Sequence, residues 1–558
     1  MRTFGVAKFR SLLVAGSFTV LANYVVGLSH SIIAGHMLGD AALAGVNLVN
    51  PCLSAISFLA GLIATGMGTN YSIAMGRCDQ RRARQFFVQA FWTIMIAGGA
   101  LAAACFFGRD AFLSFMGATP EVTVHARSYM AWTSPQAIIN GLVMLLVSLS
   151  YADGDSRICT LSYVAIFIVN LSVAVLAVWL GAGTAGCVIG SLAANLVGIA
   201  ILCLHFKRKS NTFAPVVHFS LRDTWAIMVS SFGDAAAFLC DGLLFFFLNK
   251  YVIVHFGSQW LPVVGVAVAV WGFLEFFNGI GVAIQPIVTV YYGENNTKSL
   301  RSVMNSAMGV AVVEGAAFMA LFGLLPGLVV KLVGVSDPVL VQEACVAVRY
   351  MCFGFVALAF AGLFNSYYMF VERPVLAGVV TFACYLVMPV ACVAACSLSG
   401  LHGVWLGMGI GPFAGAMLST LFIAATAGWR EYPLLLPRAR EAKLHVFDLT
   451  LDERSIVDVA QRVGEVPGVP MQASLMTEEV LMAVRDRAAG HRVLGEVTLD
   501  LNDGIVLTLR DDGEIFDITD ADAQISSLRS FLVASMMQCN AGRMNLVTTG
   551  FNRNVFRF

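Results

Sequence analysis

Residues 261–291 read LPVVGVAVAVWGFLEFFNGIGVAIQPIVTVY. Glu275 is the only charged side chain in this run of 31 residues. A helix crosses the hydrocarbon core of a bilayer, about 30 Å thick, with about 20 apolar residues. The run is therefore long enough to span a membrane, either tilted or broken.

The rest of the chain has the same apolar character. Hydrophobic residues make up 58% of its 558 residues and charged residues only 12%, and the mean hydropathy is +0.79. A soluble protein of this length carries roughly twice that charged fraction. Lipid must therefore be the solvent for most of the chain. The formal net charge of zero gives no indication of a nucleic-acid partner, and none is predicted.

Cutting the sequence at its polar and Gly/Pro-rich breaks gives about twelve stretches of spanning length. They lie near residues 12–30, 41–70, 86–107, 129–151, 158–180, 185–206, 225–255, 261–291, 303–333, 348–370, 375–397 and 403–427. No small-residue cleavage site follows the first stretch, so it is predicted to be a retained span rather than a signal peptide. The 13 cysteines include neither a CxxC pair nor a Cys/His cluster, so neither a metal site nor a disulfide framework is predicted.

Lysine and arginine indicate the orientation, because positively charged loops stay in the cytoplasm. The basic segments, each after an even-numbered stretch, are residues 77–84, 157, 207–209 with 222, 298–301, 373 and 430–443. This pattern predicts an even number of spans. It also predicts a multi-pass protein of the bacterial plasma (inner) membrane with both termini in the cytoplasm.

An internal repeat relates the two halves of the apolar region. The first half has glycine-containing blocks at residues 39–45, 66–68 and 76–79, and the second half has blocks in the same order at 257–261, 279–281 and 293–296. Repeated halves are common in secondary transporters, where the substrate sits between two lobes. A repeat can also be purely architectural.

Several motifs make this pattern more specific. They are GVAIQP at residues 281–286 followed by Tyr292-Gly293, YADGD at 151–155, FVERP at 370–374, GTAGC at 183–187 and GVWLG at 403–407. In order and spacing they resemble the multidrug and toxic compound extrusion (MATE) family. The resemblance implies an all-α polytopic membrane protein of twelve transmembrane helices in two six-helix lobes, residues 1–210 and 211–428. It implies a transporter and not an enzyme.

Charged and titratable residues inside the membrane are costly and therefore mark candidate functional sites. The candidates for cation coupling are His30, Asp241, Glu275 and Glu314. The MATE family usually places an acidic residue in the first helix, five residues before a glycine, and His30 occupies that position here. A histidine can carry a proton near neutral pH, or it can simply bond a neighbouring loop. The family often places coupling carboxylates in the second lobe, as Asp241 and Glu275 would be.

Polar residues within the spans are candidates to line a central cavity. They are Asn23, Asn47, Asn50, Gln136, Asn140, Asn170, Asn278 and Gln285. Any one of them can instead make a hydrogen bond between helices.

Beyond residue 430 charged residues become frequent. Residues 429–443 are predicted to be a basic linker near the inner leaflet, followed by a small α+β cytosolic domain over residues 444–558. Strands are predicted at 444–449, 496–502 and 505–510, and helices at 454–463 and 474–489. The order of elements resembles the histidine-kinase-like ATPase fold of anti-sigma-factor kinases.

The resemblance implies a degenerate nucleotide site. Asp511 and Gly513 match the adenine-reading Asp-x-Gly, and Glu479 belongs to the matching Glu-Glu pair. The magnesium-binding asparagine is replaced by Ala483, and the second glycine box has no clear counterpart. This pattern argues against ATP hydrolysis and kinase activity. Asp511 either retains adenine binding or forms only a turn.

The sequence thus predicts a proton- or sodium-coupled exporter of small cationic or amphipathic compounds, with a cytosolic regulatory domain. No cofactor is predicted. One alternative is a transporter-like sensor that signals to a cytosolic regulatory protein through residues 444–558. Another is a flippase for a lipid-linked precursor, although the intramembrane charges here are mainly acidic.

Overall fold

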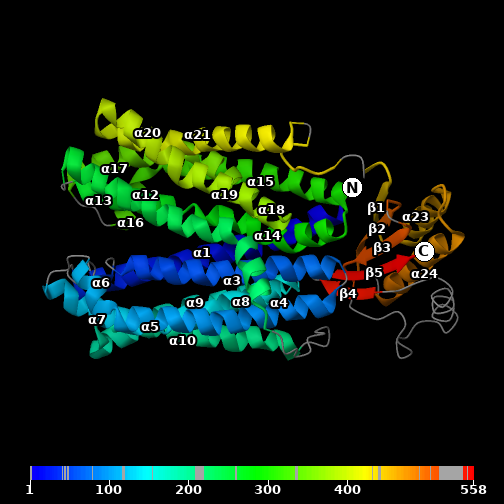
Figure 1. The fold of residues 1–558 in the computed structure, drawn as a ribbon, viewed down its shortest axis with the longest axis horizontal. Helices are drawn as coiled ribbons and strands as arrows, with labels where there is room; N and C mark the ends of the chain where they lie inside the picture. The colour runs from blue at the N-terminus through cyan, green and yellow to red at the C-terminus, as the bar shows by residue number, and fades with distance from the viewer. Residues whose placement is uncertain are drawn as a thin grey trace.

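The computed structural model describes residues 3–39, 42, 45–46, 49–77, 79–115, 120–153, 155–207, 219–257, 260–333, 337–429, 431–437, 441–488, 491–502, 504–513, 544–548 and 551–558. Long helices form two lobes that lie side by side, and a small sheet domain covers one end of both (Figure 1). We call this end the domain end and the opposite end the far end. Both chain termini lie at the domain end (Figure 1).

The first lobe holds the helices up to residue 207. They are α1 (Phe4–Leu38), α3 (Asn50–Gly76), α4 (Gln80–Thr93), η1 (Ile94–Gly98), α5 (Gly99–Phe107), α6 (Arg109–Phe115), α7 (Pro120–Thr133), α8 (Gln136–Ala152), α9 (Ser156–Ala177), η2 (Val178–Ala182), α10 (Ala185–Leu202) and η3 (Cys203–Lys207).

The second lobe repeats this arrangement. Its helices are α11 (Leu221–Ser230), α12 (Phe232–Phe256), α13 (Leu261–Gly272), α14 (Glu275–Gly293), α15 (Thr297–Leu324), α16 (Pro326–Val333), α17 (Pro338–Met351), η5 (Cys352–Gly354), α18 (Phe355–Phe370), α19 (Pro374–Phe382), η6 (Ala383–Val387), α20 (Met388–Cys396), η7 (Ser397–Ser399) and α21 (Leu401–Ala427).

The predicted fold class is confirmed. Among the described residues, ten helical segments are long and apolar enough to cross a membrane, and the pair α7 and α8, bent by 46°, makes an eleventh. The remaining predicted stretch, residues 12–30, lies within α1, a single helix of 35 residues. The run at 261–291 is broken between α13 and α14, as its length allowed.

The last glycine block of each half, at residues 76–79 and 293–296, ends one helix and starts the next. Asp79 lies three residues after Gly76 and accepts a hydrogen bond from the backbone N–H of Arg82, which caps α4. Asn296 lies three residues after Gly293 and caps α15 in the same way through Ser299 N–H. Side-chain capping of this kind satisfies amide groups that have no partner inside the helix. This part of the sequence repeat is therefore a repeated helix–turn–helix corner at the domain end.

The two lobes approach closely at these corners. A Cβ atom added to Gly76 of α3 would lie 2.9 Å from the carbonyl oxygen of Val290 and 3.2 Å from Cα of Gly293, both in α14. Further along α14, a Cβ on Gly279 would lie 2.5 Å from Cα of Ser17 in α1. Glycine is needed at such crossings because backbone meets backbone. The bundle is therefore tightly packed between the lobes at the domain end.

Helix α11 is bound to the first lobe, although the predicted second lobe begins at residue 211. Arg82 of α4 donates two hydrogen bonds to the carboxylate of Asp223, at 2.6 and 3.0 Å. Gln89 of α4 donates to Thr224 Oγ1 at 2.6 Å. The helix breaks at Ser231, and α12 continues among the helices of the second lobe.

Residues beyond 443 form one antiparallel sheet with the strand order β1-β2-β3-β5-β4. The strands are β1 (Leu444–Thr450), β2 (Leu494–Asp500), β3 (Val506–Asp511), β4 (Met544–Thr548) and β5 (Phe551–Arg557). Helices α23 (Glu453–Glu465) and α24 (Met471–Arg487) cover one face, where Val497, Leu507 and Leu509 pack against them. The strands and helices predicted above are all present, and the sheet has β4 and β5 in addition.

Candidate functional site

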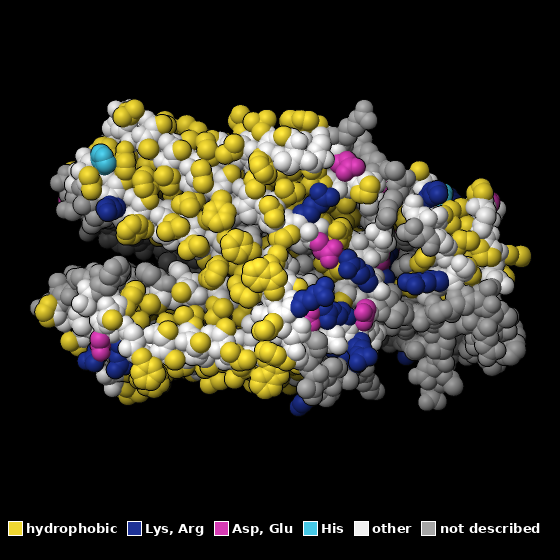
Figure 2. All heavy atoms as spheres, in the orientation of Figure 1, with side chains coloured by type: hydrophobic (Ala, Val, Ile, Leu, Met, Phe, Trp, Pro, Cys, Tyr) yellow, Lys and Arg dark blue, Asp and Glu magenta, His cyan; other side chains and the backbone are white. Residues whose placement is uncertain are grey.

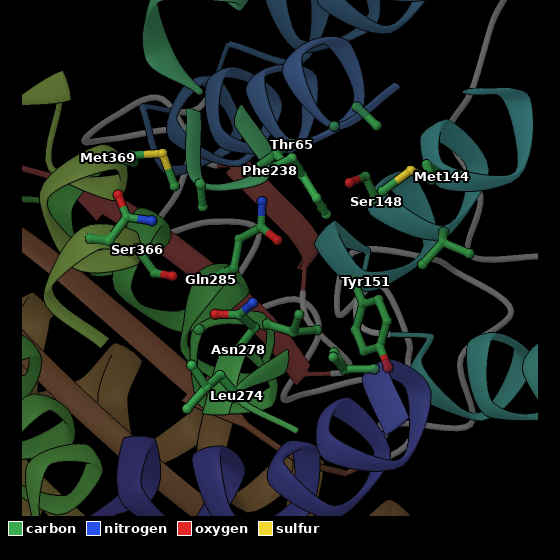
Figure 3. A pocket seen from close by; sticks show the side chains of 18 of the residues that line it. Thr65, Met144, Ser148, Tyr151, Phe238, Leu274, Asn278, Gln285, Ser366 and Met369 are labelled. Atoms are coloured by element: carbon green, nitrogen blue, oxygen red, sulfur yellow. The ribbon is translucent and has the colours of Figure 1, made fainter. Parts of the chain in front are cut away.

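A cavity of about 190 Å³ lies between the two lobes. The first lobe contributes residues of α3 and α8, including Thr65, Met144, Ser148 and Tyr151. The second lobe contributes residues of α12, α13, α14, α18 and η6 (Figure 3). A cavity shared by two lobes changes shape whenever the lobes move against each other.

The wall formed by α14 follows from helix periodicity. Asn278, Gly281 and Gln285 are spaced by three and four residues, so they lie on one face of the helix. All three line the cavity. Figure 3 shows the Gln285 side chain in the space between Ser366 on one side and Ser148 on the other. A Cβ atom on Gly281, between the two amide residues, would collide with the Ser366 side chain, so this glycine lets Ser366 of α18 approach the wall closely.

Gln285 reaches across to the first lobe. A Cβ atom on Gly68 of α3 would lie only 2.8 Å from its Nε2 atom, so Gly68 leaves the space that the amide uses. Nε2 is buried and has no hydrogen-bond partner among the described residues. A buried donor without a partner costs about 1–3 kcal/mol, so this amide is suited to bind a ligand or water.

Asp241 supplies negative charge to the cavity. Its Oδ1 atom accepts a hydrogen bond of 2.9 Å from Nε1 of Trp271. The Trp271 ring contacts Tyr385 edge-on, with ring centroids 6.4 Å apart. Among the described lining residues Asp241 is the only charged one. A carboxylate surrounded by aromatic rings favours binding of a cation.

His30 lies in a separate polar cluster inside the first lobe. Its Nδ1 and Nε2 atoms are each 2.8 Å from a hydroxyl oxygen, of Tyr129 and Ser191 respectively. Asn170 donates to Ser191 Oγ at 2.6 Å and accepts from Ser29 at 3.2 Å. Hydroxyl groups can donate or accept, so the cluster can hold the imidazole ring in either tautomer or protonated. Sequence alone did not bring Asn170 and His30 together.

The other membrane candidates are placed differently. Asn278 and Gln285 line the cavity, whereas Gln136, Asn140 and Asn170 are not among its described lining residues. Glu314 lies on α15, also away from the cavity, and its Oε2 atom is buried without a hydrogen-bond partner among the described residues. The side chains of Asn23, Asn50 and Glu275, and residue Asn47 as a whole, lie outside the described part of the chain.

In the sheet domain, Asp511 is used within the fold. Its Oδ1 atom accepts hydrogen bonds from Asn552 Nδ2 at 2.7 Å and from Gly513 N–H at 3.1 Å. Burial raises the pKa of Asp511 to about 7. Glu479 lies on α24 and is only partly buried. Asp511 and Gly513 thus form a turn to which Asn552 is hydrogen-bonded. Residues 514–543 lie outside the described residues.

Sequence reasoning missed two clusters of charged residues near the domain end. His205 lies 2.9 Å from Asp153 Oδ2 and 3.1 Å from Asp155 Oδ2, and Tyr71 donates to Asp153 at 2.9 Å. The quoted motif at 151–155 contains both carboxylates, but no local pattern pairs them with a histidine fifty residues away. The second cluster consists of Glu294, Glu496, Arg510 and Arg553, and it joins the sheet domain to both lobes.

Comparisons with known proteins agree with this geometry. The model of the MatE family matches residues 16–176 and 237–393. One similar solved structure is the outward-facing conformation of a multidrug resistance MATE family transporter of the MOP superfamily. It has a TM-score of 0.70 and 20% identity, and the match covers 76% of this chain and 98% of that chain.

A second similar structure is a MOP superfamily transporter from Pyrococcus furiosus, described as having a binding pocket of reverse polarity that suggests a different function. It has a TM-score of 0.69 and 21% identity, and the match covers 76% of this chain and 96% of that chain. A MATE protein in the straight conformation gives 0.69 and 20%, with coverage of 76% and 96%. Among curated proteins none matches the chain.

Proposed function

The chain belongs to the MATE family of membrane transporters, and we propose that it exports small cationic or amphipathic organic compounds in exchange for protons or sodium ions. The cavity between the lobes carries this proposal, because its single described charge is the Asp241 carboxylate. Trp271, Tyr385 and Phe238 supply apolar and aromatic surface around that charge. An amphipathic cation matches both features.

Coupling follows from competition for Asp241. A proton or sodium ion at the carboxylate and a cationic substrate in the same cavity exclude each other, because the site offers one negative charge. Binding of the ion from one side therefore favours release of the substrate. The His30 cluster provides a second position for a proton in the other lobe, in place of the family's first-helix carboxylate.

The domain end faces the cytoplasm of the bacterial cell in this proposal. Lysine and arginine side chains gather where the helices meet the sheet domain (Figure 2), as the positive-inside rule requires of a cytoplasmic surface. The molecule is hollowed between the lobes at the far end (Figure 2), while α3 and α14 are in backbone contact at the domain end. This corresponds to an outward-facing state in the plasma membrane.

A second function, ligand-dependent signalling through the sheet domain, is favoured by one observation. The domain is bound directly to both lobes, so a change at the cavity would reach it. Binding of a cytosolic regulatory protein to residues 444–558 that depends on a transported ligand would support this function. Flipping of a lipid-linked precursor receives no support from a cavity whose described charge is acidic.

Uptake of a cationic fluorescent dye into inverted membrane vesicles tests the proposal. Proton and sodium gradients are imposed separately, and Asp241→Asn is compared with Asp110→Asn. Asp110 is a suitable control because it is exposed at the far end and paired with Arg127. Uptake driven by one gradient and lost only in Asp241→Asn is expected. Equal uptake by both variants would show that Asp241 does not couple transport.

A further inference from the structure

A row of charged residues crosses the sheet domain on the face opposite its helices. In the strand register Glu496 of β2 pairs with Arg510 of β3, and Arg510 pairs with Arg553 of β5. Val497, Leu509 and Phe556, which lie on the same three strands, pack in the domain's own core. Alternation of this kind normally places the polar face in water. Here the three charged side chains are at most 2% exposed.

The row is buried because it lies against the domain end of both lobes. Arg553 donates from Nη1 to the carbonyl oxygen of Met75 at 3.1 Å and from Nη2 to that of Gly76 at 3.0 Å. These carbonyls belong to the last turn of α3, in the first lobe, where a helix has no internal donors for them and carries partial negative charge. The same guanidinium group pairs with Glu294, which follows α14 in the second lobe.

Glu294 is the meeting point of the charges. It occupies the C-cap of α14, where an acidic residue is unfavourable unless a cation is near. Both Arg510 and Arg553 pair with it. Arg510 also pairs with Glu496, which accepts hydrogen bonds from Tyr291 at 3.1 Å and Ser299 at 3.0 Å. Each buried charge therefore has a partner of opposite sign, as burial requires.

Other contacts hold the sheet domain mainly on α1 and on the second lobe. Asp448 accepts from the backbone N–H of Phe4 at 2.6 Å, and Glu441 pairs with Arg301 at 2.9 Å. Toward α3 and the helices packed on it in the first lobe, Arg553 and the buried side chain of Val555 make the contact. Arg553 is thus the charged link from this domain to α3, directly over the contact between Gly76 and Gly293.

We propose that the sheet domain is a clasp between the lobes, with Arg553 holding the ends of α3 and α14 together. This inference rests on the proposed transport cycle, in which those two ends must separate to open the cavity toward the cytoplasm. Hydrogen bonds of about 3 Å to the end of α3 and an ion pair with Glu294 at the end of α14 cannot both survive that separation. The clasp keeps the protein outward-facing until Arg553 leaves one of its partners, so any event that lifts the domain controls turnover.

Hydrogen–deuterium exchange of the full-length protein in detergent or nanodiscs tests the clasp without substrate or gradient. The variants are Arg553→Met and Arg557→Met. Arg557→Met is the control, because Arg557 is the same residue type on the same strand and its side chain is exposed. In Arg553→Met the amides at the end of α3 (residues 70–77) and of α14 (288–294) are expected to exchange on the order of a hundredfold faster. In Arg557→Met they are expected to exchange as in the wild type.

Unchanged exchange at both helix ends in Arg553→Met, with β2 and β3 still protected, would overturn the clasp. If β2 and β3 lose protection as well, the variant Glu294→Gln is measured in place of Arg553→Met, since it weakens the clasp from the membrane side. Faster exchange at both helix ends with protected strands supports the clasp, and unchanged exchange there rejects it. Because no transport is measured, a failure here leaves the proposed export standing, and a failure of dye uptake leaves the clasp standing.

Discussion

Replacing Gly76 by alanine tests whether contact between the lobes at the domain end limits their separation. The added Cβ would lie 2.9 Å from Val290 O and 3.2 Å from Gly293 Cα. Both are backbone atoms of α14, so neither can move aside by changing rotamer. Ordinary van der Waals contact begins near 3.4 Å, and the helices must therefore move apart by roughly half an ångström.

The size of the effect follows from this overlap. Overpacking a close contact costs about 1–3 kcal/mol. The gain in helix propensity from alanine is present whether the ends are closed or open, so it cancels in the equilibrium between the two states. The closed state should lose about 1–3 kcal/mol relative to the open state, which is about a 5- to 150-fold change in population.

Amide exchange in the last turn of α14, residues 288–293, measures this population in a helix that carries no substitution. We expect faster exchange there in Gly76→Ala by the same factor. Gly99→Ala is the matched control, because a Cβ on Gly99 of α5 has no atom within 4 Å. Exchange in Gly76→Ala that equals the control would refute the argument that this contact keeps the lobes closed.

Two further changes probe the cavity and the sheet domain. Replacing Gln285 by leucine removes the unpartnered amide of the cavity. The dye concentration that half-saturates uptake (KM) should rise about three- to tenfold, as expected for one lost hydrogen bond. An unchanged KM would mean that Gln285 does not contact the dye. Burial raises the pKa of Asp511 to about 7, above its ordinary value of 3.8. The folded domain therefore holds this proton more tightly than the unfolded chain, so the stabilisation is complete below pH 3.8 and is lost as the pH rises toward 7. Relative to Asp511→Asn, the wild-type domain should lose on the order of 4 kcal/mol between about pH 4 and pH 7, and parallel melting temperatures of the two proteins in scanning calorimetry across this range would contradict it.

Much of the fold could be predicted because membrane spans are defined by length and apolarity alone. Asp79 and Asn296 recur at the same place in the two halves of the sequence because each caps the start of a helix, and a capping residue must lie next to the first turn. Which helix face looks into the cavity was harder to predict. In a membrane both the lipid face and the protein face of a helix are apolar, so hydrophobic periodicity carries little information.

The cavity residues illustrate that limit. Thr65 and Ser148 line the cavity with Gln285, but as small hydroxyl residues they do not stand out from the sequence. Asn170 stands out and instead bonds Ser191 in the His30 cluster. Polar character alone does not tell a cavity wall from a bond between helices.

The clasp was unpredictable for a different reason. Glu496 and Arg510 alternate with apolar residues, and such a pattern indicates a strand with one face in water. The sheet follows that pattern, but the domain end of the two lobes covers its polar face. Tyr291 and Glu496, which are hydrogen-bonded across this contact, lie more than two hundred residues apart in the sequence. A contact of that kind depends on how two finished units dock, which no local spacing records.

The most direct test of coupled export uses purified protein in liposomes that contain a pH- or sodium-sensitive dye. A cationic compound is added on one side, and the flux of the ion in the opposite direction is recorded. The wild type and Asp110→Asn should both move one of the two ions as the compound moves, and Asp241→Asn should move neither. Equal ion flux in the wild type and Asp241→Asn, or movement of the compound by the wild type with no ion flux, would contradict coupled export through the cavity that holds Asp241.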